Sequence, residues 1–182
     1  MGTDKELNEK KPLVSASIKK EYKVVTMRFF VAEGLPVMDS NFLRKNSIDA
    51  YLKLKYGKKK LKTQVYTQAD GRVIWNEEFL IPVELPIRND KLEVAIMDSD
   101  EISDEKVCTM SLSLKSLLKY DLGNENPNMR SQRKWVNLYG SPKTPSVFTG
   151  SNAKKMNSDP SAASAYNGRI YLEYFAETSK HP

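Results

Sequence analysis

Acidic residues gather in two stretches of the sequence, and their spacing is the clearest chemical signal in the chain. Asp39 and Asp49 bracket the first stretch, and Asp98, Asp100 and Asp104 populate the second. Two carboxylates about 4 Å apart repel each other by roughly 4 kcal/mol at an effective dielectric constant of about 20. Such a cluster therefore persists only where a cation neutralises it, where some members are protonated, or where the side chains turn into water.

Carboxylate oxygens with no histidine among them favour Ca²⁺, which accepts about six to eight oxygen ligands in flexible loops. Mg²⁺ requires a tighter octahedron, which loops rarely supply. The two acidic stretches therefore form a candidate calcium site. A solvated turn is the alternative for the Asp-Ser-Asp-Glu stretch at residues 98–101, because Asp and Ser are common turn residues in any case.

The rest of the inventory excludes most enzyme classes. The one histidine, His181, lies next to the end of the sequence, which removes Ser-His-Asp and Cys-His catalysis. The eight glycines are too widely spaced for a P-loop or a Gly-x-Gly-x-x-Gly turn. The one cysteine, Cys108, falls in a predicted strand and is expected to be a buried thiol without chemistry. We expect a binding protein and not an enzyme.

Short alternating apolar segments must position these acids. In the first of them, Val25, Met27 and Phe29 fall on one face. Strands are predicted at 24–31, 49–56, 61–66, 74–83, 92–97, 107–112, 135–139 and 168–176, with a short helix at 113–120. This pattern predicts an all-β fold, an eight-stranded antiparallel β-sandwich. If the strands alternate in direction, the turns 34–48, 67–73 and 98–106 share one end, and the acids meet there.

Residues 1–20 are expected to form a flexible tail and residues 21–178 a single domain. The segment 141–167 is rich in Ser, Asn, Pro, Ala and Lys and lacks periodicity, so it is expected to be a mobile insertion before the last strand. No apolar run approaches the length of a membrane span, and the first residues lack a secretory signal. We expect a soluble intracellular domain.

Lysines dominate one stretch of the chain. The protein has 29 basic and 23 acidic residues, for a formal net charge of +6. Six lysines without an intervening acid equal this whole excess: Lys53, Lys55, Lys58, Lys59, Lys60 and Lys62. Each basic residue near an anionic leaflet contributes about 1 kcal/mol to binding. The alternative is a solvated edge whose lysines deter strand pairing.

Two further features bear on the partner. Phe42 and Leu43 in the first predicted turn and Ile102 in the third are expected to dip into a membrane interface, unless the first two fold back onto the sandwich. Tyrosines interleave with the lysines, which would also suit stacked nucleic-acid bases. Contacts with the core or with lipid headgroups explain those tyrosines more simply, so we expect no nucleic-acid partner.

In these motifs the chain resembles C2 domains, the calcium- and phospholipid-binding β-sandwiches. Residues 34–39 resemble the start of the family's first calcium loop, and residues 47–53 resemble its Ser-Asp-Pro-Tyr-Val segment. Residues 73–79 match its Pro-x-Trp-Asn-Glu-x-Phe stretch without the proline, and residues 92–100 match Leu-x-Val-x-Val-x-Asp-x-Asp. Residues 134–142 and 166–172 are similar to C2 domains of ferlins. A Gly-Arg-Ile-Tyr-Leu strand that closes the chain implies the type II topology.

The resemblance implies that Asp39 and Asp49 in the first loop and Asp98 and Asp100 in the third bind Ca²⁺. Lys106 stands where the family often has a fifth acid. Either Asp104 or Glu105 substitutes for that acid, or Lys106 fills part of the cation space.

The implied function is calcium-dependent binding to anionic membranes, with the lysines selecting phosphatidylserine or phosphoinositides. A ferlin-like parent protein, which could itself be membrane-anchored, would act in vesicle fusion, exocytosis or other secretion. The domain would then be cytoplasmic, at the surface of a vesicle or of the plasma membrane. The alternative is a calcium-independent C2 domain that serves as a phosphoinositide- or protein-interaction scaffold.

Overall fold

Alternation of apolar and polar residues produces the first strand, β1 (Glu21–Glu33), in which Val25, Met27 and Phe29 are fully buried. The computed structural model describes residues 20–36, 38, 47–68, 70–100, 104–122, 133–142, 151–159, 161–162 and 165–179. The other strands are β2 (Ile48–Tyr56), β3 (Lys59–Lys62), β4 (Tyr66–Gln68), β5 (Val73–Leu85), β6 (Lys91–Asp98), β7 (Glu105–Ser113), β8 (Lys134–Gly140) and β9 (Ala165–Ser179). The helices are α1 (Leu114–Leu122) and α2 (Ser151–Ser158).

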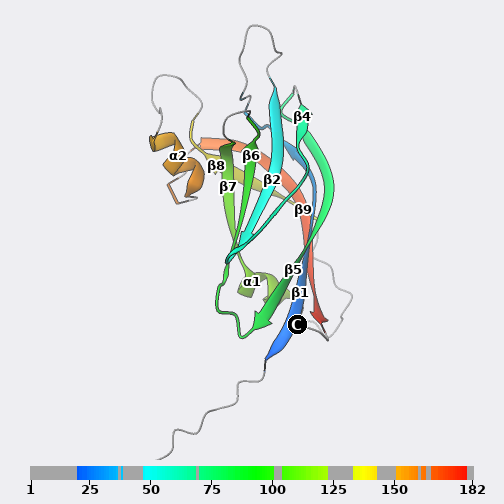
Figure 1. Cartoon of the computed structure of the whole chain (residues 1–182). Coiled ribbons are helices and arrows are strands. Elements are labelled where there is room, and N and C mark those ends of the chain that lie inside the picture. Colours follow the sequence, from blue (N-terminus) through cyan, green and yellow to red (C-terminus); the bar gives the residue numbers. More distant parts are fainter. Residues whose placement is uncertain are drawn as a thin grey trace, which may run out of the picture.

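The strands form two layers that face each other (Figure 1). One layer has the order β3-β2-β6-β7 and the other β8-β9-β1-β5, while β4 pairs with β2. The layers are continuous where Thr109 of β7 pairs with Tyr139 of β8. The last strand, β9, lies between β8 and β1 and not at an edge. This placement agrees with the expected topology, and the predicted antiparallel sandwich is confirmed.

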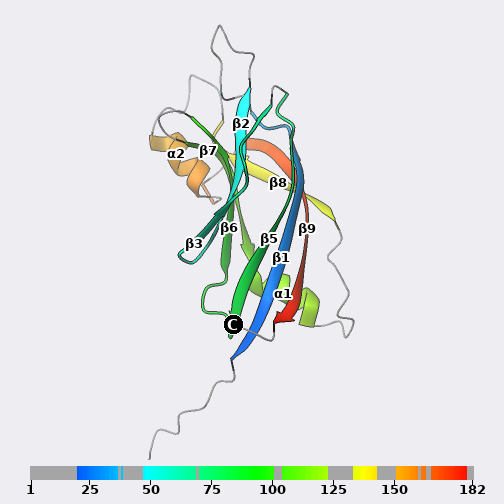
Figure 2. The same cartoon turned by 45° about the vertical axis from the view of Figure 1, so that its right-hand side comes forward.

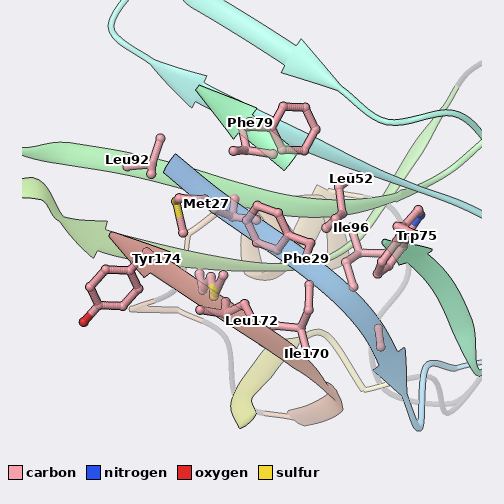
Figure 3. Close-up of a cluster of buried hydrophobic side chains, with 14 of the residues drawn as sticks. Met27, Phe29, Leu52, Trp75, Phe79, Leu92, Ile96, Ile170, Leu172 and Tyr174 are labelled. Atoms are coloured by element: carbon pink, nitrogen blue, oxygen red, sulfur yellow. The ribbon is translucent and has the colours of Figure 1, made fainter. Parts of the chain in front are cut away.

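The core fills the space between the layers. Figure 3 shows Met27 and Phe29 of β1 close to Leu52 of β2 and to Ile170 and Leu172 of β9. These five side chains are at most 1% exposed, as expected for the inward positions of alternating strands. The apolar faces predicted from the sequence therefore are the faces that meet in the core.

The prediction of one strand at 61–66 is wrong in detail. The chain forms β3 up to Lys62 and β4 from Tyr66, so the described residues contain nine strands where eight were expected. The reason lies at Thr63, whose backbone N–H donates to the carbonyl of Leu52 at 3.0 Å. Its Oγ1 accepts a hydrogen bond from the Leu52 N–H at 2.9 Å and donates to the carbonyl of Gln64. A hydroxyl thus takes the place of a ladder carbonyl and interrupts the strand.

A helix that the sequence pattern did not predict, α2, lies in the segment 141–167 and packs against β7 and β8. Asn157 fixes it there, because its buried Oδ1 accepts a hydrogen bond from the backbone N–H of Ser141 at 2.6 Å. The amide of Asn167 in β9 donates to the carbonyls of Val107 and Ser141. Within the described residues, no helix is long and apolar enough to cross a bilayer.

Candidate functional site

The described residues of the three predicted turns lie at one end of the sandwich. The N–H of Leu35 in the first turn donates to the carbonyl of Gly71 in the second at 3.0 Å. A Cβ at Gly71 would lie 2.4 Å from the Leu35 carbonyl oxygen, and φ there is +68°, so both packing and backbone require glycine. The N–H of Ser99 in the third turn donates to the carbonyl of Asp49 at 2.9 Å.

Asp49 and Asp98 are brought together at this end. The pairing of β2 with β6 sets Ala50 opposite Asp98, and Asp98 Oδ1 accepts a hydrogen bond from the Asp49 backbone N–H at 2.8 Å. Asp98 is 2% exposed. Asp49 Oδ1 is buried and has no hydrogen-bond partner among the described residues. A buried carboxylate oxygen without a donor is rare, because the lost hydration must be replaced by some other positive partner.

Two other predicted metal ligands, Asp100 and Asp104, have surroundings that differ from those of Asp49 and Asp98. Asp100 follows Asp98 and is exposed. Asp104 accepts a hydrogen bond from the hydroxyl of Tyr51, whose ring packs with Ala95 and Met97 on the outer surface of its layer. Burial, and then the hydrogen bond to Asp104, raises the pKa of Tyr51 to about 12.

Four of the predicted residues, Asp39, Phe42, Leu43 and Ile102, lie outside the described residues. Across the part of the chain that the structure describes, no three acidic, histidine or cysteine side chains cluster closely enough to hold a metal ion.

The lysines divide between two surfaces. Cross-strand pairing sets Lys53 of β2 opposite Lys62 of β3, and Lys55 opposite Lys60. These four residues share the outer side of the layer and are called the lysine face below. Lys62 Nζ lies over the ring of Tyr51, 5.7 Å from its centre. Lys58 occupies the turn after Gly57, and Lys59 points to the opposite side, where it lines a cavity. Figure 2 shows β3 at the margin of the molecule beside β2.

Two lysines that sequence reasoning did not include adjoin the lysine face. Lys91 of β6 pairs with Glu93 at 3.1 Å, and Glu93 also lies 3.6 Å from Lys55. Lys106 is set opposite Met97 by a register shift between β6 and β7. Burial lowers the pKa of Lys106, and the charges of Lys53, Lys55 and Lys91 lower it further while that of Glu93 raises it.

The position of Lys106 answers one question that the sequence left open. Its electrostatic neighbours are the lysines of β2 and β6, so it belongs to the lysine face and not to the gap beside Asp49. The signal that could have found it is the register shift, which a single sequence does not reveal.

Comparison with known proteins decides the family. Residues 23–137, more than half of the chain, match the family model of the C2 domain. This chain belongs to the C2 domain family. The match covers β1 to β7 and most of β8, so it includes Asp49, Asp98 and the lysine face of this C2 domain.

Solved structures share its fold. The first C2 domain (domain A) of plant extended synaptotagmin 1 has 20% identity and a TM-score of 0.54, with 87% of this chain and 96% of that chain covered. The calcium-bound pair of C2 domains, A and B, of extended synaptotagmin 2 has 17% identity and a TM-score of 0.57, with 84% and 45% covered.

Human GIVD cytosolic phospholipase A2 has 19% identity and a TM-score of 0.57, with 88% of this chain and 17% of that chain covered. This C2 domain thus spans less than half of the last two proteins. At these identities the likeness concerns the fold. The resemblance to ferlin domains is not addressed by these proteins and stays a prediction.

Proposed function

We propose that this C2 domain binds anionic phospholipid headgroups at the cytoplasmic surface of a membrane through its lysine face, without catalysis. The main support is the pairing of Lys53 with Lys62 and of Lys55 with Lys60, which places four ammonium groups on one side of a hairpin. Burial is the main cause of the lowered pKa of Lys106, and the nearby charges of Lys53, Lys55 and Lys91 lower it further against the opposing charge of Glu93. Phosphate oxygens on one headgroup would neutralise several of these ammonium groups together.

The ligand chemistry favoured by this face is multiply charged. Adjacent strands lie about 4.8 Å apart, so neighbouring lysines reach the same phosphate cluster. Phosphoinositides carry such clusters, and phosphatidylserine supplies a weaker, distributed negative charge. We therefore expect both lipids to bind, and phosphoinositides to bind more tightly.

Vesicle binding tests the proposal. Replacing Lys53 and Lys62 together by Gln should weaken binding to phosphatidylcholine vesicles that contain phosphoinositide by at least about tenfold, because each lysine contributes about 1 kcal/mol. The matched control replaces Lys115 and Lys134, which are exposed on α1 and β8, and removes the same charge elsewhere. Cosedimentation at several salt concentrations measures the effect.

Equal losses in the two double variants would show that net charge alone attracts the protein, and the lysine face would lose its role. Binding of oligonucleotides but not of vesicles by the unmodified protein would also contradict the proposal. A role in vesicle fusion or secretion rests on the resemblance of residues 134–142 and 166–172 to ferlins.

A second candidate function, calcium sensing, is favoured by the buried and unpartnered Asp49 Oδ1 beside Asp98. Hard carboxylate oxygens suit Ca²⁺, and these two residues would hold it. A bound cation would supply the positive partner that Asp49 lacks and would make the loop end attractive to anionic lipid. Vesicle binding would then be calcium-dependent.

Thermal unfolding during a calcium titration tests this candidate. At a free Ca²⁺ concentration about 100 times the dissociation constant, the free energy of unfolding should rise by about 2.7 kcal/mol. Asp98→Asn should abolish the rise, because it removes the charge and keeps an oxygen for the Asp49 N–H. Asp70→Asn, at the same end of the sandwich, should leave the rise intact. If millimolar Ca²⁺ does not change the melting temperature of the unmodified protein, the domain is calcium-independent.

A further inference from the structure

A cavity opens at the side of the sandwich, where the edge strands β3 and β5 leave the layers unjoined. Its volume is about 190 Å³. Leu54, Ile81 and Leu92 form its buried floor, and each is at most 3% exposed. Leu61 and Leu80 stand at its rim, 40% and 57% exposed. Apolar side chains thus run without a break from the surface into the core.

The cavity is open at the surface, and core side chains form its floor. Water gains little here, because an apolar wall offers it no hydrogen-bond partners. An apolar cavity of about 150 Å³ is large enough to bind benzene, so this one accommodates several methylene groups. The lining therefore suits a hydrocarbon.

The two edge strands argue against a peptide as the occupant. Pro82 lies in β5 beside the cavity and has no N–H to offer to an added strand. On the other side, β3 has only four residues, of which Lys59, Lys60 and Lys62 are lysines that deter strand pairing. The occupant must therefore bind without backbone pairing, as an alkyl chain does.

The charges around the cavity indicate which headgroup its occupant carries. Lys59 is the one charged residue among the described residues that line the cavity, and Lys58 and Lys60 flank it in the sequence. Glu84 acts on neighbouring Tyr56, since burial and then the Glu84 charge raise the pKa of that tyrosine. However, Glu84 is already paired with Lys20 at 2.9 Å. A cationic headgroup would meet repulsion here, whereas an anionic one would meet Lys59.

We propose that this cavity binds the alkyl chain of a fatty acid, with its carboxylate paired to Lys59. The site is distinct from the lysine face, because strand alternation turns Lys59 and Leu61 toward the cavity and Lys60 and Lys62 away from it. A substitution at one site should therefore reduce binding there without affecting binding at the other.

Calorimetric titration of the full chain with dodecanoate, below its micelle concentration, tests this assignment. Leu80→Asp places a carboxylate at the rim and should weaken binding at least about tenfold, because it removes apolar contact and adds repulsion. Ile74→Asp changes a residue of the same strand that is 45% exposed and outside the cavity lining, and it should bind as the unmodified protein does. Unfolding curves verify that both variants fold.

The charge is tested separately. Lys59→Met should weaken dodecanoate binding about fivefold, since an exposed ion pair contributes up to about 1 kcal/mol, and it should leave dodecanol binding unchanged. Lys58→Met is the matched control. The double Lys53 and Lys62 variant should retain dodecanoate binding, and Leu80→Asp should retain vesicle binding. Absence of saturable dodecanoate binding, or equal affinities of Leu80→Asp and Ile74→Asp, would overturn the proposal.

Discussion

Lys106 illustrates at the scale of one residue how function and stability oppose each other. Burial is the largest cause of its lowered pKa, and the charges of Lys53, Lys55 and Lys91 lower it further. Among the described residues, Glu93 is the acidic neighbour that offsets this positive charge, and an anionic ligand would add a further counter-charge. If the lysine face binds lipid as we propose, the charge that attracts the lipid is also a charge that destabilises the free domain.

Replacing Lys106 by Met should stabilise the domain at neutral pH by up to about 1 kcal/mol, because it removes a partly buried ammonium group that also has three lysines among its charged neighbours. The same change should weaken vesicle binding. Since the native pKa lies below the ordinary value of 10.5, the unfolded chain binds more protons between the two values. The stability of the unmodified protein therefore gains there as pH rises, and the advantage of the variant should shrink.

Denaturant unfolding at a series of pH values measures this difference. Lys115→Met changes an exposed lysine of α1, serves as the control and should show no pH-dependent difference of this kind. A Lys106→Met variant that is less stable than the unmodified protein at pH 7 would show that the side chain is held by favourable contacts, contrary to our interpretation.

At the scale of elements, Glu173 joins the strands of the second layer. Its side chain is 5% exposed on β9 and accepts hydrogen bonds from Arg28 of β1 at 3.1 Å and from Arg133, just before β8, at 3.0 Å. Arg133 also stacks over Phe30, 4.6 Å from the ring centre. Burial alone would raise the pKa of Glu173, but the two arginines outweigh it and hold the pKa below its ordinary value.

Glu173→Gln should lower the free energy of unfolding by about 2 kcal/mol at pH 7, because charge-assisted hydrogen bonds to a buried carboxylate are lost. With a depressed native pKa, this contribution is complete above the ordinary value of 4.5 and is lost as pH falls through the native pKa. The stabilities of the two proteins should therefore converge in acid. Urea unfolding measures both stabilities, and Glu177→Gln, at an exposed position of the same strand, should be as stable as the unmodified protein. If the stability difference between Glu173→Gln and the unmodified protein stays constant down to about pH 3, the carboxylate of Glu173 is not the source of that difference.

At the scale of the whole molecule, the sandwich separates three surfaces. The acidic end is formed by turns between strands, the lysine face by the outer side of β2 and β3, and the cavity by the open side between β3 and β5. Strand alternation separates the last two, although their lysines are neighbours in the sequence. One core thus carries three separate surfaces, for which we propose different ligands.

The sequence alone determined the strands, the helix α1 and the class of fold. Alternation with period two depends only on which residues are apolar, and the predicted faces around Met27 and Leu52 are buried as expected. The sequence-based prediction of a single strand failed at Thr63. There a side-chain hydroxyl replaces a backbone carbonyl in the hydrogen-bond ladder, which leaves no trace in the alternation of apolar residues. The sequence pattern also missed α2, whose position depends on a hydrogen bond between Asn157 and distant Ser141.

Tertiary structure decided which individual charged side chains meet. Asp49 and Asp98 are 49 positions apart and come together through the β2–β6 pairing, as the alternation of strand directions led us to expect. Alternation predicts Lys53 and Lys55 on one face, but the register shift that places Lys106 and the turning of Lys59 toward the cavity were not foreseeable. Register is set by the combined packing of both layers, and a shift of one residue turns each side chain to the opposite face. Composition determines how much charge a chain carries, whereas the pairing between strands determines which groups surround each charged side chain.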